Sequence, residues 1–130
     1  MHRSRLAGFI IDCNTDDLDG AAEFWCAALG YQRRRSKEQA DAGYALLDTP
    51  AGDLHIEVQK VTHPSRVHID IESDDVEAEV RRLEKLGAKR LQQVRTWWVM
   101  EAPTGQRFCV VRPQREGFAE AANTWDDDKR

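Results

Sequence analysis

The stretch that decides the fold is VHIDIESDD, residues 67–75. Successive side chains of a strand point to opposite faces, so this stretch has one apolar face and one ionisable face. The apolar face carries Val67, Ile69 and Ile71, and the ionisable face carries His68, Asp70 and Glu72. A histidine that shares a strand face with two carboxylates is unusual where that face is only solvated, and His68 is therefore the first candidate for a functional side chain.

The same pattern occurs once more, earlier in the chain. Residues 11–17, IDCNTDD, match residues 69–75, IDIESDD, with one Ile and three Asp identical and Thr facing Ser. A run with apolar residues at helical spacing follows each copy and ends at a glycine, Gly30 in the first and Gly87 in the second. This duplication predicts two tandem β-α-β-β-β modules, an α+β fold with pseudo-twofold symmetry.

The predicted modules run from about residue 6 to 60 and from about residue 66 to 112, within a domain of residues 1–113. In module one we expect a helix over 18–29 and strands over 6–13, 31–33, 44–47 and 54–59, with a polar loop at 36–42. In module two we expect a helix over 75–86 and strands over 66–72, 91–94, 97–100 and 107–112. Residues 114–130 form a charged tail, whose aromatic residues Phe118 and Trp125 either dock on the domain or on a partner subunit, or leave the tail partly ordered.

Composition excludes several classes of protein. The 130 residues are 41% hydrophobic and 32% charged, and no apolar run approaches the length of a membrane span. The basic N-terminus precedes an apolar run too short for a signal peptide, so we expect a cytoplasmic protein with no membrane partner. The net charge of −4 disfavours nucleic acid, and the cluster Arg33-Arg34-Arg35 is interpreted as a solvated face. Three cysteines without C-x-x-C spacing predict neither a disulfide framework nor a zinc ribbon.

Several motifs resemble one known superfamily. These are Phe24-Trp25, Leu29-Gly30-Tyr31, Leu86-Gly87-Ala88 and the turn APTGQRF at 102–108, which is similar to a D-P-x-G-N turn. With the tandem modules they resemble the vicinal oxygen chelate superfamily, which includes glyoxalase I, bleomycin-resistance proteins and extradiol dioxygenases. HID at 68–70, WWVM at 97–100 and FCVV at 108–111 are similar, more narrowly, to bacterial glyoxalase-like domain proteins. The resemblance implies curved sheets whose polar faces line a cup, completed within one chain or across two. Because exposed strand edges need covering, we expect a homodimer.

The resemblance also implies where a metal would bind. Metal-binding members of the superfamily place ligands on strands one, four, five and eight, which correspond here to Ile10, Glu57, His68 and Cys109. Because Ile10 cannot bind a metal, the set is incomplete and we expect no cofactor. A divalent metal, if present, would be held by His68 and Glu57, with Cys109 contributing only if the metal suits a thiolate.

The catalytic candidates are His68, as a general base, and Glu57, as the carboxylate that orients it. Asp70 could orient His68 in place of Glu57. Alternatively, His68 has no catalytic role and only forms a structural hydrogen bond across the sheet. The ligand-binding candidates are Asp12, Asp70, Tyr44, Trp97, Trp98, Arg107 and Cys109.

Each ligand-binding candidate has a structural alternative. Trp97 and Trp98 are adjacent, so one of them should face the cup, where it could stack on a ligand; the alternative is that both pack in the core. Tyr44 lies on the corresponding strand of module one and has the same two interpretations. Arg107 either anchors an anion or is solvated, and Cys109 is either a reactive thiol or a small core residue. Asp12 and Asp70 either line the site or fix the seam between the modules.

We therefore expect a small-molecule binding protein, or a lyase- or isomerase-type enzyme, without the full metal-ligand set. One alternative is a bleomycin-resistance-type protein that sequesters a ligand, with Phe118 and Trp125 closing the groove. The other alternative is a metal-dependent enzyme of the glyoxalase or dioxygenase type.

Overall fold

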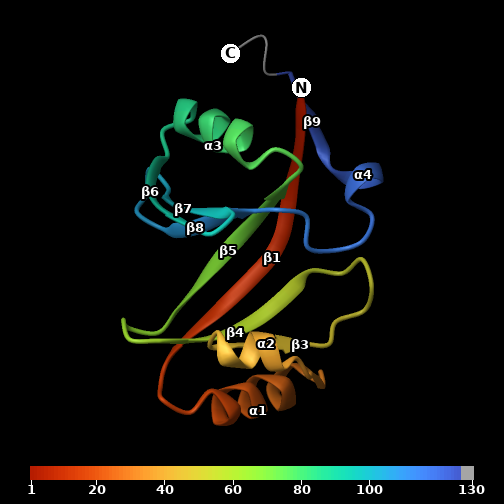
Figure 1. Cartoon of the computed structure of the whole chain (residues 1–130), viewed down its shortest axis with the longest axis vertical. Coiled ribbons are helices and arrows are strands. Elements are labelled where there is room, and N and C mark those ends of the chain that lie inside the picture. The colour runs from red at the N-terminus through yellow and green to blue at the C-terminus, as the bar shows by residue number, and fades with distance from the viewer. Residues whose placement is uncertain (127–130) are drawn as a thin grey trace. The chain divides into compact units, whose positions relative to one another are not determined.

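The computed structural model describes residues 1–126, with Asp41 described by its backbone alone. The chain forms two compact units (Figure 1). The module-one unit is Phe9–Val67, and the module-two unit combines Met1–Gly8 with the chain from His68 onward. The first strand, β1 (His2–Asn14), contributes residues to both.

The module-one unit contains a three-stranded antiparallel sheet in the order β2-β3-β4. Helix α1 packs against β3 and β4 (Figure 1). The core consists of Ile11, Ala22, Cys26, Ala45, Leu47, Ile56 and Val58. The elements are α1 (Leu18–Leu29), β2 (Arg33–Arg34), α2 (Lys37–Asp41), β3 (Tyr44–Leu47) and β4 (His55–Val61).

In the module-two unit, β5 pairs in parallel with β8, and β8, β7 and β6 pair in antiparallel order. Helix α3 packs on β6, β7 and β8 over a core of Val80, Leu83, Met100, Phe108 and Val110 (Figure 1). The elements are β5 (Arg66–Ser73), α3 (Val76–Lys85), β6 (Lys89–Val94), β7 (Trp97–Glu101), β8 (Arg107–Val111), α4 (Phe118–Ala121) and β9 (Asn123–Trp125).

The predicted order of elements, β-α-β-β-β twice in an α+β fold, is confirmed. The repeated motif explains why both helices start where they do. Its last aspartate is the N-cap in each module: Asp17 Oδ1 accepts a hydrogen bond from Gly20 N at 2.9 Å, and Asp75 Oδ1 accepts one from Ala78 N at 3.0 Å. The loop predicted over 36–42 is wrong, because Ser36 caps a short helix there, accepting a hydrogen bond from Gln39 N at 3.3 Å.

The predicted faces of β5 are partly wrong. Ile71 packs against the core under α3, but Ile69 is 47% exposed and Val67 is 60% exposed. Helix α3 packs on β6, β7 and β8, and the core beneath it includes Ile71 of β5 but not Ile69. On the ionisable face, Asp70 is 8% exposed and Glu72 is fully buried.

Residues 114–126 of the tail dock on the module-two unit, while residues 127–130 of the predicted tail lie outside the described part. Strand β9 pairs in antiparallel register with His2–Ser4 of β1. Two arginines cover the tail aromatics: the Arg5 guanidinium lies 5.6 Å from the centre of the Phe118 ring, and that of Arg82 lies 3.8 Å from the centre of a Trp125 ring. Both contacts have cation–π geometry.

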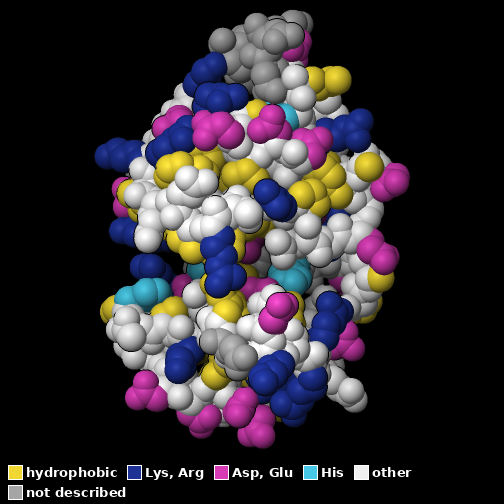
Figure 2. All heavy atoms as spheres, in the orientation of Figure 1, with side chains coloured by type: hydrophobic (Ala, Val, Ile, Leu, Met, Phe, Trp, Pro, Cys, Tyr) yellow, Lys and Arg dark blue, Asp and Glu magenta, His cyan; other side chains and the backbone are white. Residues whose placement is uncertain are grey.

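Acidic and basic side chains intermingle over the face shown in Figure 2, including the surface around α3. Among the described residues, no helix combines the length and the hydropathy needed to cross a bilayer.

Candidate functional site

Strand register brings three of the predicted site residues together. His68 and Asp70 lie two residues apart on β5 and therefore share a face, and the parallel pairing places Asp70 opposite Cys109 on β8. One imidazole nitrogen, one carboxylate oxygen and the Cys109 sulfur all lie within 4.8 Å of one another. We call His68, Asp70 and Cys109 the β5–β8 cluster.

The β5–β8 cluster is largely shielded from water. His68 Nε2 lies 3.7 Å from Asp70 Oδ1, and the two side chains are 13% and 11% exposed. That distance is too long for a direct hydrogen bond between these two atoms. Cys109 is also buried. The cluster therefore places an imidazole, a carboxyl group and a thiol side by side in largely buried surroundings.

The donor set of the cluster also fits a metal ion. Nitrogen, oxygen and sulfur donors together suit Zn²⁺, which binds histidine, carboxylate and thiolate ligands. Neighbouring ligand atoms in a tetrahedral zinc site lie about 3.4 Å apart, so atoms as far as 4.8 Å apart would need to approach one another by at most about 1.4 Å. Three protein ligands would leave a fourth position for water or substrate.

The cluster differs from the metal set that the resemblance implied. His68 and Cys109 occupy two of its four positions, Asp70 adds a third donor, and Ile10 is buried and apolar. Glu57 lies in the module-one unit, where its Oε1 is 2.8 Å from His55 Nε2. Both side chains project from one face of β4, a spacing visible in the sequence, yet His55 was not a candidate. The pairing of Glu57 with His68 stays a prediction.

The two other module-one candidates have polar neighbours within their unit. Asp12 is 2% exposed, and its Oδ2 lies 3.8 Å from Arg66 Nε. The Tyr44 hydroxyl accepts a hydrogen bond of 2.9 Å from Gln59 Nε2.

Of the two tryptophans, Trp98 packs against the core under α3, and the Arg90 guanidinium lies 4.9 Å from the centre of its ring. Trp97 is half-buried and remains the candidate for a stacking platform. Arg107 Nε lies 3.7 Å from Glu101 Oε2 on the neighbouring strand, and the arginine is 43% exposed.

Comparison with known proteins assigns most of the chain, including the β5–β8 cluster, to one family. The family model for the glyoxalase-like domain matches residues 8–111, and no curated protein matches the chain.

The chain is also similar to solved structures. One is a methylmalonyl-CoA epimerase in complex with methylmalonyl-CoA and NH4+, at 21% identity and a TM-score of 0.59, covering 88% of this chain and 98% of that one. A Streptomyces coelicolor methylmalonyl-CoA epimerase variant in complex with 2-nitronate-propionyl-CoA has 18% identity and a TM-score of 0.57, covering 85% and 98%. The methylmalonyl-CoA epimerase from Mycobacterium tuberculosis has 19% identity and a TM-score of 0.54, covering 85% and 89%.

At these identities the solved structures show a shared fold, that of the vicinal oxygen chelate superfamily. The family match covers most of the sequence, from the start of module one to the end of module two. The chain therefore belongs to the glyoxalase-like domain family.

Proposed function

We propose that this protein is an isomerase- or lyase-type enzyme that moves a proton on a small carbonyl compound at the β5–β8 cluster. The observation that carries the proposal is the convergence of His68, Asp70 and Cys109 within 4.8 Å. The family match and the fold shared with methylmalonyl-CoA epimerases support it. Epimerisation beside a thioester and isomerisation of a hemithioacetal both remove a proton from a carbon that is bonded to a carbonyl carbon.

In this proposal His68 carries the proton. Imidazole is the side chain best suited to exchange a proton near neutral pH. Asp70, 3.7 Å from His68 Nε2, stabilises the imidazolium formed when His68 accepts a proton. Removal of Asp70 should therefore weaken His68 as a base without displacing it.

A second candidate function is metal-dependent, and the mixed donor set of the cluster favours it. His68, Asp70 and Cys109 would hold a Zn²⁺-class ion, which would polarise a carbonyl oxygen of the substrate. In that case Cys109 is a ligand, whereas in the metal-free case it only packs beside the two reacting groups. Cys109→Ser therefore separates the two candidates.

The test measures turnover of methylmalonyl-CoA and of the hemithioacetal of glutathione and methylglyoxal by purified full-length protein, before and after chelation. For the metal-free enzyme we expect turnover that survives chelation, falls by about 10²–10⁴-fold in His68→Gln, and changes little in Cys109→Ser. For the metal-dependent enzyme we expect loss on chelation, restoration by Zn²⁺ and loss in Cys109→Ser. No turnover of either substrate would argue against both.

Two variants serve as matched controls. His63→Gln removes a histidine from the linker between the modules, where His63 Nδ1 donates to Pro64 O at 2.8 Å. Cys13→Ser removes a half-buried cysteine of β1. Losses in these variants equal to those in His68→Gln and Cys109→Ser would mean that the effects are not specific to the cluster.

A further inference from the structure

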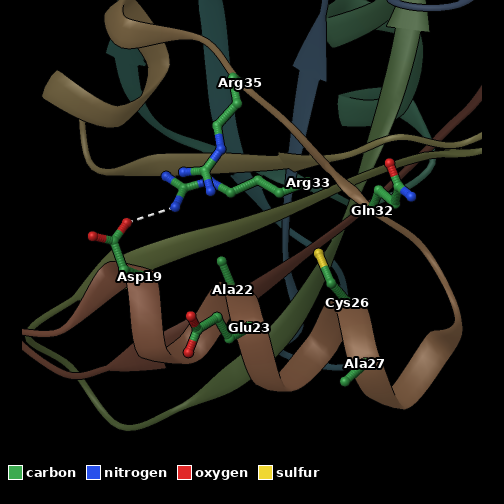
Figure 3. Close-up of a pocket in the computed structure, with 8 residues that line it drawn as sticks. All are labelled: Asp19, Ala22, Glu23, Cys26, Ala27, Gln32, Arg33 and Arg35. Carbon is green, nitrogen blue, oxygen red and sulfur yellow. Dashed lines mark hydrogen bonds and ion pairs between the residues drawn. The ribbon is translucent and has the colours of Figure 1, made fainter.

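A hollow lies within the module-one unit, and none of its lining residues belongs to the β5–β8 cluster. It has a volume of about 620 Å³ and is formed by α1 and the chain around β2 (Figure 3). This volume is within the range of about 300–1,000 Å³ that is typical of sites for small molecules. We call it the α1–β2 hollow.

Small side chains of α1 create the space. Ala22 and Cys26 lie one turn apart on the side of α1 that faces Arg33 and Arg35 (Figure 3), and Ala27 also lines the hollow. Ala22 and Cys26 are buried, whereas Ala27 is exposed. The α1 wall therefore combines these three small side chains with the carboxylates of Asp19 and Glu23.

Two arginines line the opposite wall. Arg33 donates through one guanidinium nitrogen to Asp19 Oδ1 at 2.5 Å, and Arg35 makes no hydrogen bond or ion pair with any residue that the structure describes. Figure 3 shows both side chains directed toward the Asp19 end of the hollow. The hydrogen bond from Arg33 and the charges of Arg33 and Arg35 hold the pKa of Asp19 below its usual value, so both cations act at this end.

The arginine wall itself carries two positive charges, which face the two carboxylates of α1. Arg34, the residue between the two arginines, has its own partner outside the hollow, since its guanidinium lies 2.9 Å from Asp48 Oδ1. Asp19 and Glu23 of α1 line the same hollow, but of these two carboxylates only Asp19 has a hydrogen bond to an arginine that the structure describes. An anion placed between the two guanidinium groups would relieve the repulsion between them.

We propose that the α1–β2 hollow binds a small molecule through a carboxylate or phosphate group placed between Arg33 and Arg35. Guanidinium groups match the planar or tetrahedral oxygens of such anions by paired hydrogen bonds. Ala22 and Ala27 would contact the apolar part of the molecule. Glu23, also at the hollow, disfavours highly charged ligands and limits the affinity. The site is separate from the proposed proton-transfer centre and does not depend on it.

The test titrates ¹⁵N-labelled full-length protein with inorganic phosphate and, separately, with succinate, at constant ionic strength. We expect saturable amide shifts confined to residues 19–35, with a dissociation constant on the order of millimolar because the arginine wall is partly exposed. Saturation by only one of the two probes would identify the preferred anion, and either result supports the proposal.

Variants of the arginine cluster make the test specific. Arg35→Gln and Arg33→Gln should each weaken binding by about tenfold, the loss expected for one charge-assisted contact. Arg34→Gln removes the same charge from the same segment but outside the hollow, and should change binding by less than about twofold. Asp19→Asn should tighten binding, because it releases Arg33 from its ion pair. Amide dispersion of each variant confirms that it is folded.

Two results would overturn the proposal. The first is the absence of saturable shifts at residues 19–35 with either probe. The second is an equal weakening by Arg34→Gln and Arg35→Gln, which would mean that the anions respond to net charge rather than to the hollow.

Discussion

His2 Nε2 lies 2.7 Å from Glu79 Oε1, and both side chains are completely buried. Glu79 also accepts two hydrogen bonds from Arg82, at 2.9 Å from Nε and 2.8 Å from a terminal nitrogen. Arg82 in turn stacks on Trp125 of β9. One buried carboxylate of α3 thus joins the first strand, the helix and the tail of the module-two unit.

We predict that Glu79→Ala destabilises the protein by about 3 kcal/mol, because it leaves Arg82 without its counter-charge and removes the buried hydrogen-bond partner of His2 Nε2. The measurement is the free energy of unfolding from urea denaturation. Glu84→Ala is the matched control, since Glu84 lies on the same helix in an exposed ion pair with Arg90. A loss in Glu79→Ala no greater than in Glu84→Ala would contradict the role assigned to Glu79.

The same carboxylate predicts how stability depends on pH. Burial acts to raise the pKa of Glu79, but hydrogen bonds from Arg82, His2 and Ser4 outweigh it, and the pKa lies below the ordinary value of 4.5. A carboxyl group with a lowered pKa contributes stability above its unfolded pKa and loses it as the pH falls through its folded pKa. A hydrogen bond from Arg90 lowers the pKa of Glu77 in the same direction.

We therefore expect the free energy of unfolding to fall as the pH decreases below about 4.5. Urea denaturation between neutral pH and pH values below 4.5 measures this slope. In Glu79→Gln the slope should be smaller, because one of the responsible groups no longer titrates. An identical slope in the variant would show that Glu79 makes no contribution to it.

Trp125 is predicted to hold the tail on the module-two unit. Its ring stacks under Arg82, and its Nε1 donates to Ser4 Oγ at 2.8 Å. Trp125→Ala should cost about 1–3 kcal/mol and accelerate amide exchange in residues 123–125. Trp125→Phe should cost less, because it keeps an aromatic ring and loses only the hydrogen bond. Unchanged exchange in Trp125→Ala would contradict this role.

The two helix-ending glycines provide a matched pair of variants. Gly30 has φ 80° and open space where a Cβ would lie, whereas Gly87 has φ 108° and a Pro103 Cγ 3.2 Å from that position. Gly30→Ala should cost about 1 kcal/mol from backbone strain alone. Gly87→Ala should cost more, because Pro103 must also move. Equal losses of unfolding free energy in the two variants would show that Pro103 adjusts freely.

Much of the fold was predictable because its signals are local. The motif ending in Asp17 and Asp75 supplies both N-caps, and Gly30 and Gly87 follow the helices, so the repeat alone predicts the modules. The exposure of Ile69 was not predictable from alternation, because it depends on how far α3 extends along β5. The helix over Lys37–Asp41 was missed because its five residues lack an apolar stripe.

The candidate site was predictable in part. Alternation places His68 and Asp70 on one face, but only the parallel pairing of β5 with β8 brings Cys109 beside them, and that register is not a local property. The burial of Glu79 was missed for the same reason, since its partner His2 is far away in the sequence. The α1–β2 hollow depends on where Arg33 and Arg35 point, and the sequence shows only an arginine run.

The central claim is that His68 transfers a proton in the β5–β8 cluster. The most direct measurement incubates methylmalonyl-CoA or the hemithioacetal in D₂O and follows deuterium incorporation by mass spectrometry, with wild-type protein, His68→Gln and His63→Gln in parallel. The account predicts incorporation with at least one substrate in wild type and His63→Gln, and a rate lower by about 10²-fold or more in His68→Gln. Equal rates in wild type and His68→Gln would contradict it.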